Sequence, residues 1–289
     1  MNEATQQFFN DYVRRLDALQ GWNDVNTQLA DWHFQQKDEQ VIAPVVDDIN
    51  ACLNWENHRN RFRDHVLTTL VGQPGNGLLF VSANPGWNER ANNVESAFRA
   101  NQANNQQFGS DFFHVFHQLG LKNNWWSRAI LLAHLVYTGG EAEIPAGLRW
   151  NWAQEGHAIG NLDLLPFHST GDQFGTLRGP GVRAALRDVA RSTLQTALRL
   201  TPMPRLIFVA SALGAPIADA LCVELGMVHV PGPDDAPQPF AQLNRYVHLE
   251  TGARVMTFPY QTFAGNAAIY LPVGFMRPLA AQLRQFGNF

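Results

Sequence analysis

Short apolar runs that end in polar and turn-forming residues give the chain its clearest pattern. The first run, Leu78 to Val81, is preceded by Gly77 and followed by the segment Ser82-Ala83-Asn84-Pro85-Gly86. Three further runs lie within 160–169, 204–210 and 254–259. Unbroken apolar runs of this length are typical of strands that are covered on both faces, as in a parallel sheet. The pattern therefore predicts a central, mostly parallel four-stranded sheet.

Apolar residues at helical spacing occupy much of the chain around these runs. Amphipathic or buried helices are predicted at 4–20, 57–70, 125–137, 182–200 and 217–225. The stretch between the first two helices is less regular and contains Trp22, Trp32 and Trp55. Helices before and between parallel strands indicate an α/β protein, and we expect a three-layer α/β/α fold. The whole chain, 1–289, is interpreted as one domain with an N-terminal helical extension over about 1–72.

The composition is that of a globular protein with a substantial core. Hydrophobic residues make up 45% of the chain and charged residues 16%, and no apolar run is long enough to cross a bilayer. The N-terminal residues lack the basic and apolar regions of a signal peptide, and two cysteines, Cys52 and Cys222, provide no disulfide framework. We therefore expect a protein of the reducing cytoplasm with no membrane role.

Local clusters of charged residues bear on whether the chain binds nucleic acid. The net charge of -4 argues mildly against binding to nucleic acid, because phosphate binding requires clustered Lys and Arg. Arginines nevertheless cluster at 59–63 and at 178–191, which is compatible either with solvated helix faces or with a phosphate-binding surface. Two cysteines exclude a four-cysteine cluster, and the pair His114 and His117 has no evident third ligand. We expect no metal and no other cofactor.

The first strand and its turn resemble a segment of the uracil-DNA glycosylases, above all of their mismatch-specific and single-strand-selective branches. Those proteins carry a Gly-x-Asn-Pro-Gly turn after a strand, where this chain has Ser82 to Gly86. Later segments follow in the family's order, each at a strand end. Asn161 stands where the second segment has an Asn, and Gly214-Ala215 stand where Gly-Ser is usual. In the last segment Pro259 is kept, whereas Phe258 replaces His and Tyr260 replaces Ser.

The resemblance implies a role for each segment. Asn84 would be the catalytic residue and would orient a water molecule toward the sugar. The residues expected to surround an extruded base are Ser82, Ala83, Trp87, Phe98 and Asn161, although the two rings could equally be core residues. The residues expected to contact DNA are Arg178, Arg183, Gly214, Ala215, Pro259, Tyr260 and Gln261. An Asn amide is suited to reading a pyrimidine, because it can pair with a carbonyl and an N–H together.

The activity that the resemblance implies is removal of a base from DNA. Lys37 and Lys122 lie outside the matched segments, so no Schiff-base nucleophile is indicated and the product would be an abasic site. Phe258 removes the donor that stabilises a departing uracil, which favours bulky modified pyrimidines of phage DNA, in the manner of antiphage glycosylases. Ordinary uracil or mismatch repair is the alternative within the family. A catalytically inactive nucleic-acid-binding module of the same fold is the alternative outside enzymes.

Overall fold

The computed structural model describes residues 1–53, 61–64, 70–72, 74–83, 124–140, 159–169, 179–210, 214–232, 243–258 and 273–289. The chain divides into two compact units, each assembled from three segments. Unit 1 comprises Met1–Val71, Ser82–Phe108 and Leu162–Thr201. Unit 2 comprises Gly72–Val81, Gly109–Asn161 and Pro202–Phe289.

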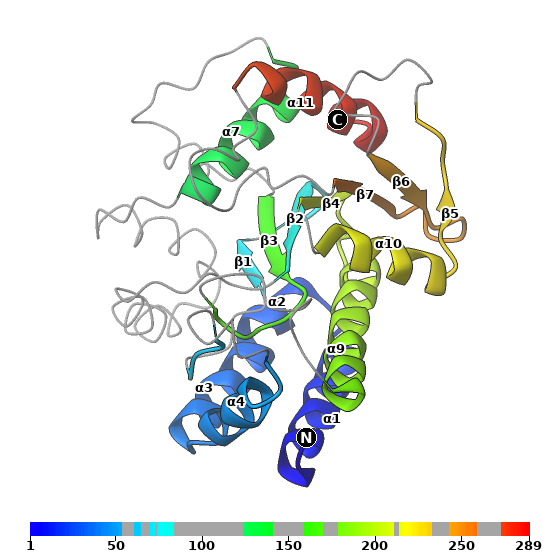
Figure 1. Ribbon diagram of the computed structural model, residues 1–289. Coiled ribbons are helices and arrows are strands. Elements are labelled where there is room, and N and C mark those ends of the chain that lie inside the picture. The colour runs from blue at the N-terminus through cyan, green and yellow to red at the C-terminus, as the bar shows by residue number, and fades with distance from the viewer. Residues whose placement is uncertain are drawn as a thin grey trace. The chain divides into compact units, whose positions relative to one another are not determined.

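The strands form one mixed sheet in the order β1-β3-β2-β4-β7-β6-β5 (Figure 1). They are β1 (Leu70–Gly72), β2 (Leu78–Ser82), β3 (Ile159–Asp163), β4 (Leu206–Ala210), β5 (Val228–His229), β6 (Asn244–Val247) and β7 (Arg254–Phe258). Strand β4 is parallel to both β2 and β7, with Val81 beside Val209 and Ala210 beside Phe258. Strands β6 and β5 continue the sheet in antiparallel fashion.

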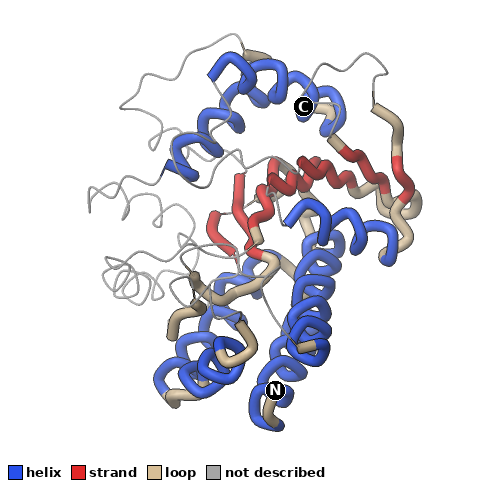
Figure 2. The backbone as a smooth tube through the Cα atoms, viewed as in Figure 1, coloured by secondary structure: helices blue, strands red, loops and turns tan. Residues whose placement is uncertain are grey.

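The four predicted strands are neighbours in this sheet, as β3, β2, β4 and β7 (Figure 2). Nearly all of their residues are buried, as the apolar runs require for strands covered on both faces. The predicted α/β class is confirmed. Within the described residues the sheet has seven strands instead of four, because β1, β5 and β6 extend it at its two ends. Each of these three has only two to four residues, too few to form a recognisable apolar run.

In unit 2, helices cover both sides of strands β4 and β7. Helix α11 (Val273–Gly287) contacts both strands and packs along α7 (Asn124–Thr138), whereas α10 (Gly214–Glu224) contacts β4, β5 and β7. Figure 1 shows α11 on one side of these two strands and α10 on the other. Burial on both faces explains why the strands contain no alternating polar positions.

Unit 1 is a helical assembly with an aromatic core. Its helices are α1 (Glu3–Ala18), α2 (Trp22–Asp24), the π-helical turn η1 (Val25–Leu29), α3 (Ala30–Asp38), α4 (Ile42–Asn50) and α9 (Pro180–Arg199). Helix α1 packs against α9 and α4. The Phe8 ring stacks on Trp32 with centroids 5.3 Å apart, and Phe167 contacts Phe9 and Phe62 at centroid distances of 5.9 and 6.0 Å. Aromatic contacts of this kind add to the free energy of burial.

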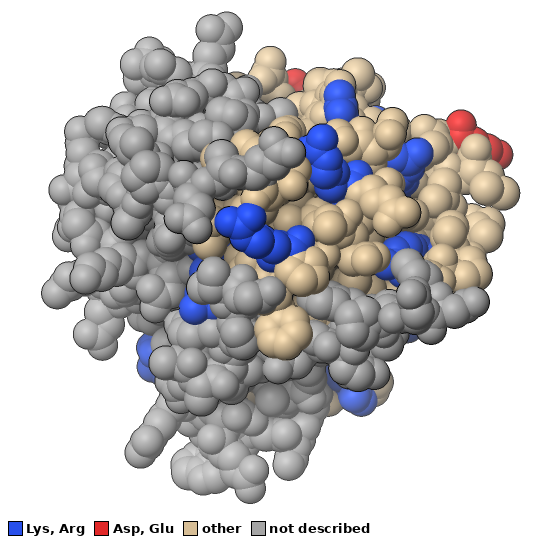
Figure 3. Space-filling model, turned by 90° about the horizontal axis from the view of Figure 1, so that it is seen from above, with Lys and Arg blue, Asp and Glu red and all other residues tan. Residues whose placement is uncertain are grey.

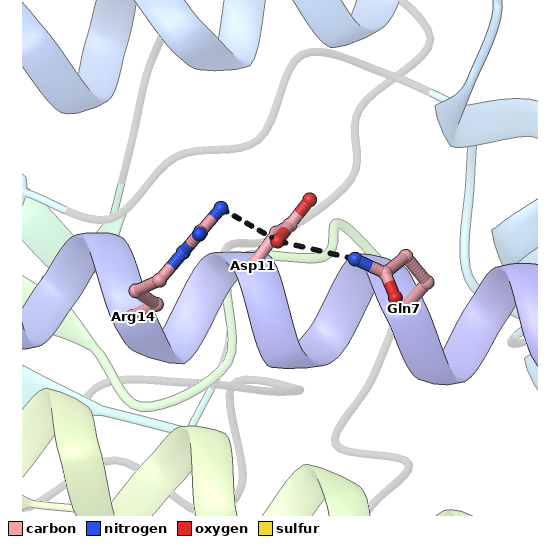
Figure 4. A network of polar contacts seen from close by, with 3 residues as sticks. All are labelled: Gln7, Asp11 and Arg14. Atoms are coloured by element: carbon pink, nitrogen blue, oxygen red, sulfur yellow. Dashed lines mark hydrogen bonds and ion pairs between the residues drawn. The ribbon is translucent and has the colours of Figure 1, made fainter.

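The outer face of α1 is polar and solvated, in contrast to its aromatic inner face. Asp11 accepts hydrogen bonds from Gln7 Nε2 at 3.4 Å and from Arg14 Nη2 at 2.9 Å (Figure 4). Pairs three or four residues apart on an exposed helix each contribute a few tenths of a kcal/mol. The helix begins at a cap in which Asn2 Oδ1 accepts from the Thr5 N–H at 2.8 Å. Helix α1 is therefore stabilised mainly by its buried side.

Two predictions for the N-terminal part were wrong. The stretch after α1 was expected to be irregular, but α2, η1, α3 and α4 make it largely helical. A helix was expected over 57–70, yet Phe62 forms a bridge with Ser169 and Leu70 begins β1. The Asn50 amide explains the extended backbone at Phe62, because it donates to the Phe62 carbonyl at 2.9 Å and accepts from its N–H at 2.8 Å. This tertiary contact overrides the helical spacing of the sequence.

The four other predicted helices are confirmed as α1, α7, α9 and α10, with bounds within three residues of those expected. Pro180 occupies the first position of α9, where its missing N–H has no intrahelical role. Gly179 precedes it with φ of 99°, a conformation that favours glycine. No helix within the described part of the chain is long and apolar enough to cross a membrane.

Candidate functional site

The end of β2 lies beside the residues that follow β3. The Leu164 N–H donates to the Ser82 carbonyl and the Leu165 N–H donates to the Ala83 carbonyl, each at 2.9 Å. Ser82 is half-buried and Ala83 is buried. These two hydrogen bonds hold together the first two of the segments singled out in the sequence. Asn84, Trp87 and Phe98, which follow along the chain, lie outside the described residues.

Strand β3 and the residues after it carry a row of buried polar side chains. Asn161, Asp163, His168 and Ser169 are each less than 10% exposed, and each has an interaction partner. Asn161 was expected at the opening of the second strand, but it lies in the middle of β3. Asp163 is the last residue of the strand, and because side chains alternate along a strand it shares a face with Asn161.

Asp163 and His168 were not singled out in the sequence. The signal that points to Asp163 is the Asn-Leu-Asp alternation within an otherwise apolar run. His168 has no such signal, because its position is fixed by a tertiary contact in which its carbonyl accepts from the Arg63 N–H at 2.8 Å. Together with the bridge from Phe62 to Ser169, this contact fixes the path of the chain beyond β3.

In unit 2, the adjacent ends of β4 and β7 carry the third and fourth candidate segments. Ala210 is paired with Phe258, whose side chain is completely buried. The residue that stands in place of the family's His is therefore a core ring. Gly214 and Ala215 are the first residues of α10, and both are buried, Ala215 completely. Pro259, Tyr260 and Gln261 lie outside the described residues.

Arg183, one of the two arginines predicted to contact DNA, lies on α9 together with two further arginines of the same cluster. Arg183, Arg187 and Arg191 are exposed and follow one another at intervals of four residues, so they form a row on one face of the helix with a rise of roughly 6 Å between neighbours. Like charges at this spacing destabilise a helix by a few tenths of a kcal/mol per pair. Arg178 lies outside the described residues.

A second polar cluster, between α10 and strands β6 and β7, has a structural role. The Asp219 carboxylate accepts hydrogen bonds from Asn244 Nδ2 at 2.9 Å and from Thr257 Oγ1 at 2.5 Å. Burial, together with the nearby Asp219 charge, raises the pKa of the Cys222 thiol to about 12. A thiol that stays protonated at neutral pH is a poor nucleophile. Within the described ranges, no three His, Cys, Asp or Glu side chains are grouped as a metal site would require.

Sequence comparisons with known proteins do not assign a function to this chain. The chain matches no model of a known protein family and no curated protein. Function is therefore inferred from the motifs in the sequence and from the positions that the described residues take within each unit.

Proposed function

We propose that the protein is a monofunctional DNA glycosylase, which hydrolyses the N-glycosidic bond of an extruded pyrimidine and leaves an abasic site. The observation that supports this proposal best is the pair of hydrogen bonds from Leu164 and Leu165 to Ser82 and Ala83. These hydrogen bonds join the end of β2, which leads to Asn84, to the segment that follows β3. Two motifs that act on one base must be neighbours of this kind. In this proposal β3, β2, β4 and β7 form the core of a three-layer, uracil-DNA glycosylase-like fold.

The proposed chemistry follows from the residue types. Cleavage of an N-glycosidic bond passes through a sugar with oxocarbenium character, so the protein must position water and accommodate the leaving base. Asn84 would orient the water, since an amide can hold it but cannot deprotonate it strongly. The base must first leave its stack, which costs a few kcal/mol and less when the base is modified or unpaired. The exposed row of Arg183, Arg187 and Arg191 would offset phosphate charge.

The substrate proposed is a bulky modified pyrimidine, such as those of phage DNA, so that the biological role would be antiviral defence in the cytoplasm. Phe258 is buried and apolar, and it offers no hydrogen bond to the oxygen of a departing uracil. Loss of one such donor typically reduces the rate roughly 100- to 1000-fold. Contacts to a large 5-substituent could recover that loss, because remote binding energy can be used for orientation at the reacting bond.

The test is release of free base from matched duplexes that contain uracil, 5-hydroxymethylcytosine or glucosylated 5-hydroxymethylcytosine, followed by alkaline scission at the abasic site. We expect faster release of the glucosylated base than of uracil, and loss of release in Asn84→Ala. The control is Asn10→Ala, which removes an exposed Asn on α1 whose Oδ1 accepts from Gln6 Nε2 at 3.0 Å. Absence of base release from all three duplexes by the folded wild-type protein would reject the proposal.

A second candidate function, binding of nucleic acid without catalysis, is favoured by the same Phe258. A core ring in the position of a charged donor is the change expected in a protein that has lost the reaction but kept the fold. DNA binding that weakens with added salt and with Arg183→Ala, in the absence of any base release, would identify this function. Base release from the glucosylated duplex would exclude it.

A further inference from the structure

A groove of about 590 Å³ lies in unit 2, between the C-terminal end of α7 and one face of α11. Its volume is in the range of small-molecule sites, which is roughly 300 to 1000 Å³. Leu135, Gly139 and Gly140 form the α7 wall, and Arg277, Ala281 and Arg284 are among the residues of the α11 wall. The groove contains none of the residues proposed to act on a base.

The two arginines are held in place by the end of α7. Arg284 Nη1 donates to the carbonyls of Val136 and Tyr137 at 2.7 and 3.1 Å, and Arg277 Nη1 donates to the carbonyl of Gly140. Cations at this position oppose the negative end of the helix dipole and satisfy carbonyls that have no intrahelical donor. The guanidinium groups are therefore fixed before any ligand arrives, which reduces the entropy lost on binding.

Arg284 retains the edge of its guanidinium that best binds an oxyanion. Nη1 makes both hydrogen bonds to α7, and within the described ranges Nε and Nη2 have no acceptor. The Nε and Nη2 hydrogens point in parallel and match two oxygens of one phosphate or carboxylate. Arg277 lies seven residues away on the same helix, roughly 10 Å along its axis, and adds a second positive charge to the groove.

The two helices that form the groove carry only positive charge. Helices α7 and α11 contain three arginines and no Asp or Glu. Figure 3 views the molecule from above the view of Figure 1, and on its described surface Lys and Arg are spread widely while Asp and Glu are confined to the margin. A groove with this environment attracts anions and disfavours cations.

Other residues of the groove provide a small, partly apolar space. Ala280 and Ala281 keep the α11 wall low, and Gly139 and Gly140 adopt φ of 71° and 81°, which favour glycine and bring the backbone close to the guanidinium groups. The Phe289 ring also lines the groove and is fixed at 5.2 Å from the Tyr137 ring in an edge-on contact. A flat ring beside a phosphate-binding edge suits a ligand that has both a phosphate and an aromatic base.

We propose that the α7–α11 groove binds a nucleotide phosphate, with its oxygens on Nε and Nη2 of Arg284 and its base against Phe289 and Ala281. The phosphate belongs either to a free mononucleotide or to a strand of DNA, and the chemistry of recognition is the same for both. The site does not depend on the proposed glycosylase activity, because it shares no residue with it.

The test is isothermal titration calorimetry of the full chain with inorganic phosphate, deoxycytidine 5′-monophosphate and an unmodified single-stranded oligonucleotide. Arg284→Lys keeps the charge but loses the paired donors, and we expect it to weaken binding roughly 10- to 100-fold. Ala281→Trp fills the groove from an exposed position without altering the contacts to α7, and should abolish binding. The control Ala4→Trp places the same bulk at an exposed position of α1, outside the arginine row of α9, and should change nothing.

The outcomes separate the two sources of the phosphate. Groove-dependent binding of the mononucleotide alone identifies a free nucleotide, and groove-dependent binding of the oligonucleotide identifies DNA. The proposal is overturned if neither probe binds, if only inorganic phosphate binds, or if binding is unchanged in both Ala281→Trp and Arg284→Lys. Base release is measured on the same samples, so that failure of the groove and failure of the proposed glycosylase activity are seen independently.

Discussion

Two helix pairs, one in each unit, use an arginine in the same way but differ in what surrounds it. In unit 1, Arg199 of α9 donates to the carbonyls of Leu16 and Leu19 at the end of α1. In unit 2, Arg284 of α11 donates to two carbonyls at the end of α7. Each arginine donates to carbonyls at the end of a helix and joins that helix to its neighbour, although the Leu16 carbonyl also accepts from the Leu19 N–H and from Thr196 Oγ1, each at 3.3 Å.

The two guanidinium groups differ in what they leave available. Arg199 divides its donors between Nη1 and Nη2, and the same interface contains a hydrogen bond of 2.7 Å from Ser192 Oγ to Asp17. Arg284 uses Nη1 alone and lines a groove whose α11 wall is formed partly by Ala280 and Ala281. The residues around each arginine therefore determine what it can do. Polar partners complete the interface around Arg199, whereas small residues leave a groove open beside Arg284.

The largest difference is expected when one leucine is shortened in each pair. Leu16 of α1 is buried at 1% exposure beneath α9, whereas Leu135 of α7 lines the groove. Leu16→Ala should lower the free energy of unfolding by about 3 to 4 kcal/mol, because it leaves a closed cavity. Leu135→Ala should cost about 2 kcal/mol, because this side chain, although only 5% exposed, borders the groove, so that shortening it enlarges an open space and leaves no closed cavity. Urea unfolding of both variants measures the difference, and equal losses would contradict it.

Removal of the two arginines should give a smaller difference in the same direction. Arg199→Ala should cost about 2 kcal/mol, because it breaks charged hydrogen bonds in a completed interface. Arg284→Ala should cost only about 1 kcal/mol, since water in the groove can replace the donors at the end of α7. Chemical unfolding at one pH and salt concentration compares the two. Arg14→Ala, which removes the exposed pair with Asp11, is the control and should lie within about 0.5 kcal/mol of wild type.

Much of the sheet could be predicted because burial on both faces leaves a direct trace in the sequence. Strand β4 is an uninterrupted apolar run, β2 is one up to Ser82, and β7 is apolar apart from Arg254 and Thr257. Parallel neighbours have their carboxyl ends at one edge of the sheet. Strand β6 is not marked by an apolar run in the sequence, because it contains Asn244 and Arg245. Their side chains are satisfied by Asp219 and by Gln282, at 2.9 and 2.7 Å, in contacts that only the folded chain creates.

The candidate site could be predicted only in outline. Ser82 lies at a strand end as expected, because the change from apolar to polar residues marks that end. Asn161 lies inside β3, because the strand begins at Ile159 and continues through Asp163. The polar residues Asn161 and Asp163 therefore do not mark its ends. The groove was not predicted at all. Arg277 and Arg284 look like solvated helix residues in the sequence, and only the end of α7 shows that they are fixed.

The smallest predicted effect is a difference between the two units in how their stability depends on pH. In unit 1, hydrogen bonds from the Asn2 N–H, at 2.8 Å, and from Thr5 lower the pKa of Asp48 from 3.8, although its slight burial acts in the opposite direction. In unit 2, burial raises the pKa of Tyr137 to about 12, although the Leu78 N–H, which donates to its hydroxyl at 3.2 Å, acts in the opposite direction. The first group should make unit 1 sensitive to acid and the second should make unit 2 sensitive to alkali.

The sign follows from the state that binds more protons. Unfolded Tyr137 ionises near its ordinary pKa of 10.0, while the folded protein keeps the proton up to about pH 12, so stability is intact below pH 10 and declines between these values. Asp48 contributes stability above pH 3.8 that is lost as the pH falls through its lower folded pKa. Tyr137→Phe should therefore flatten the alkaline decline without altering the acid limb, and Asp48→Asn should do the reverse. Free energies of unfolding measured across both limbs test this, and an alkaline slope that is unchanged in Tyr137→Phe would contradict it.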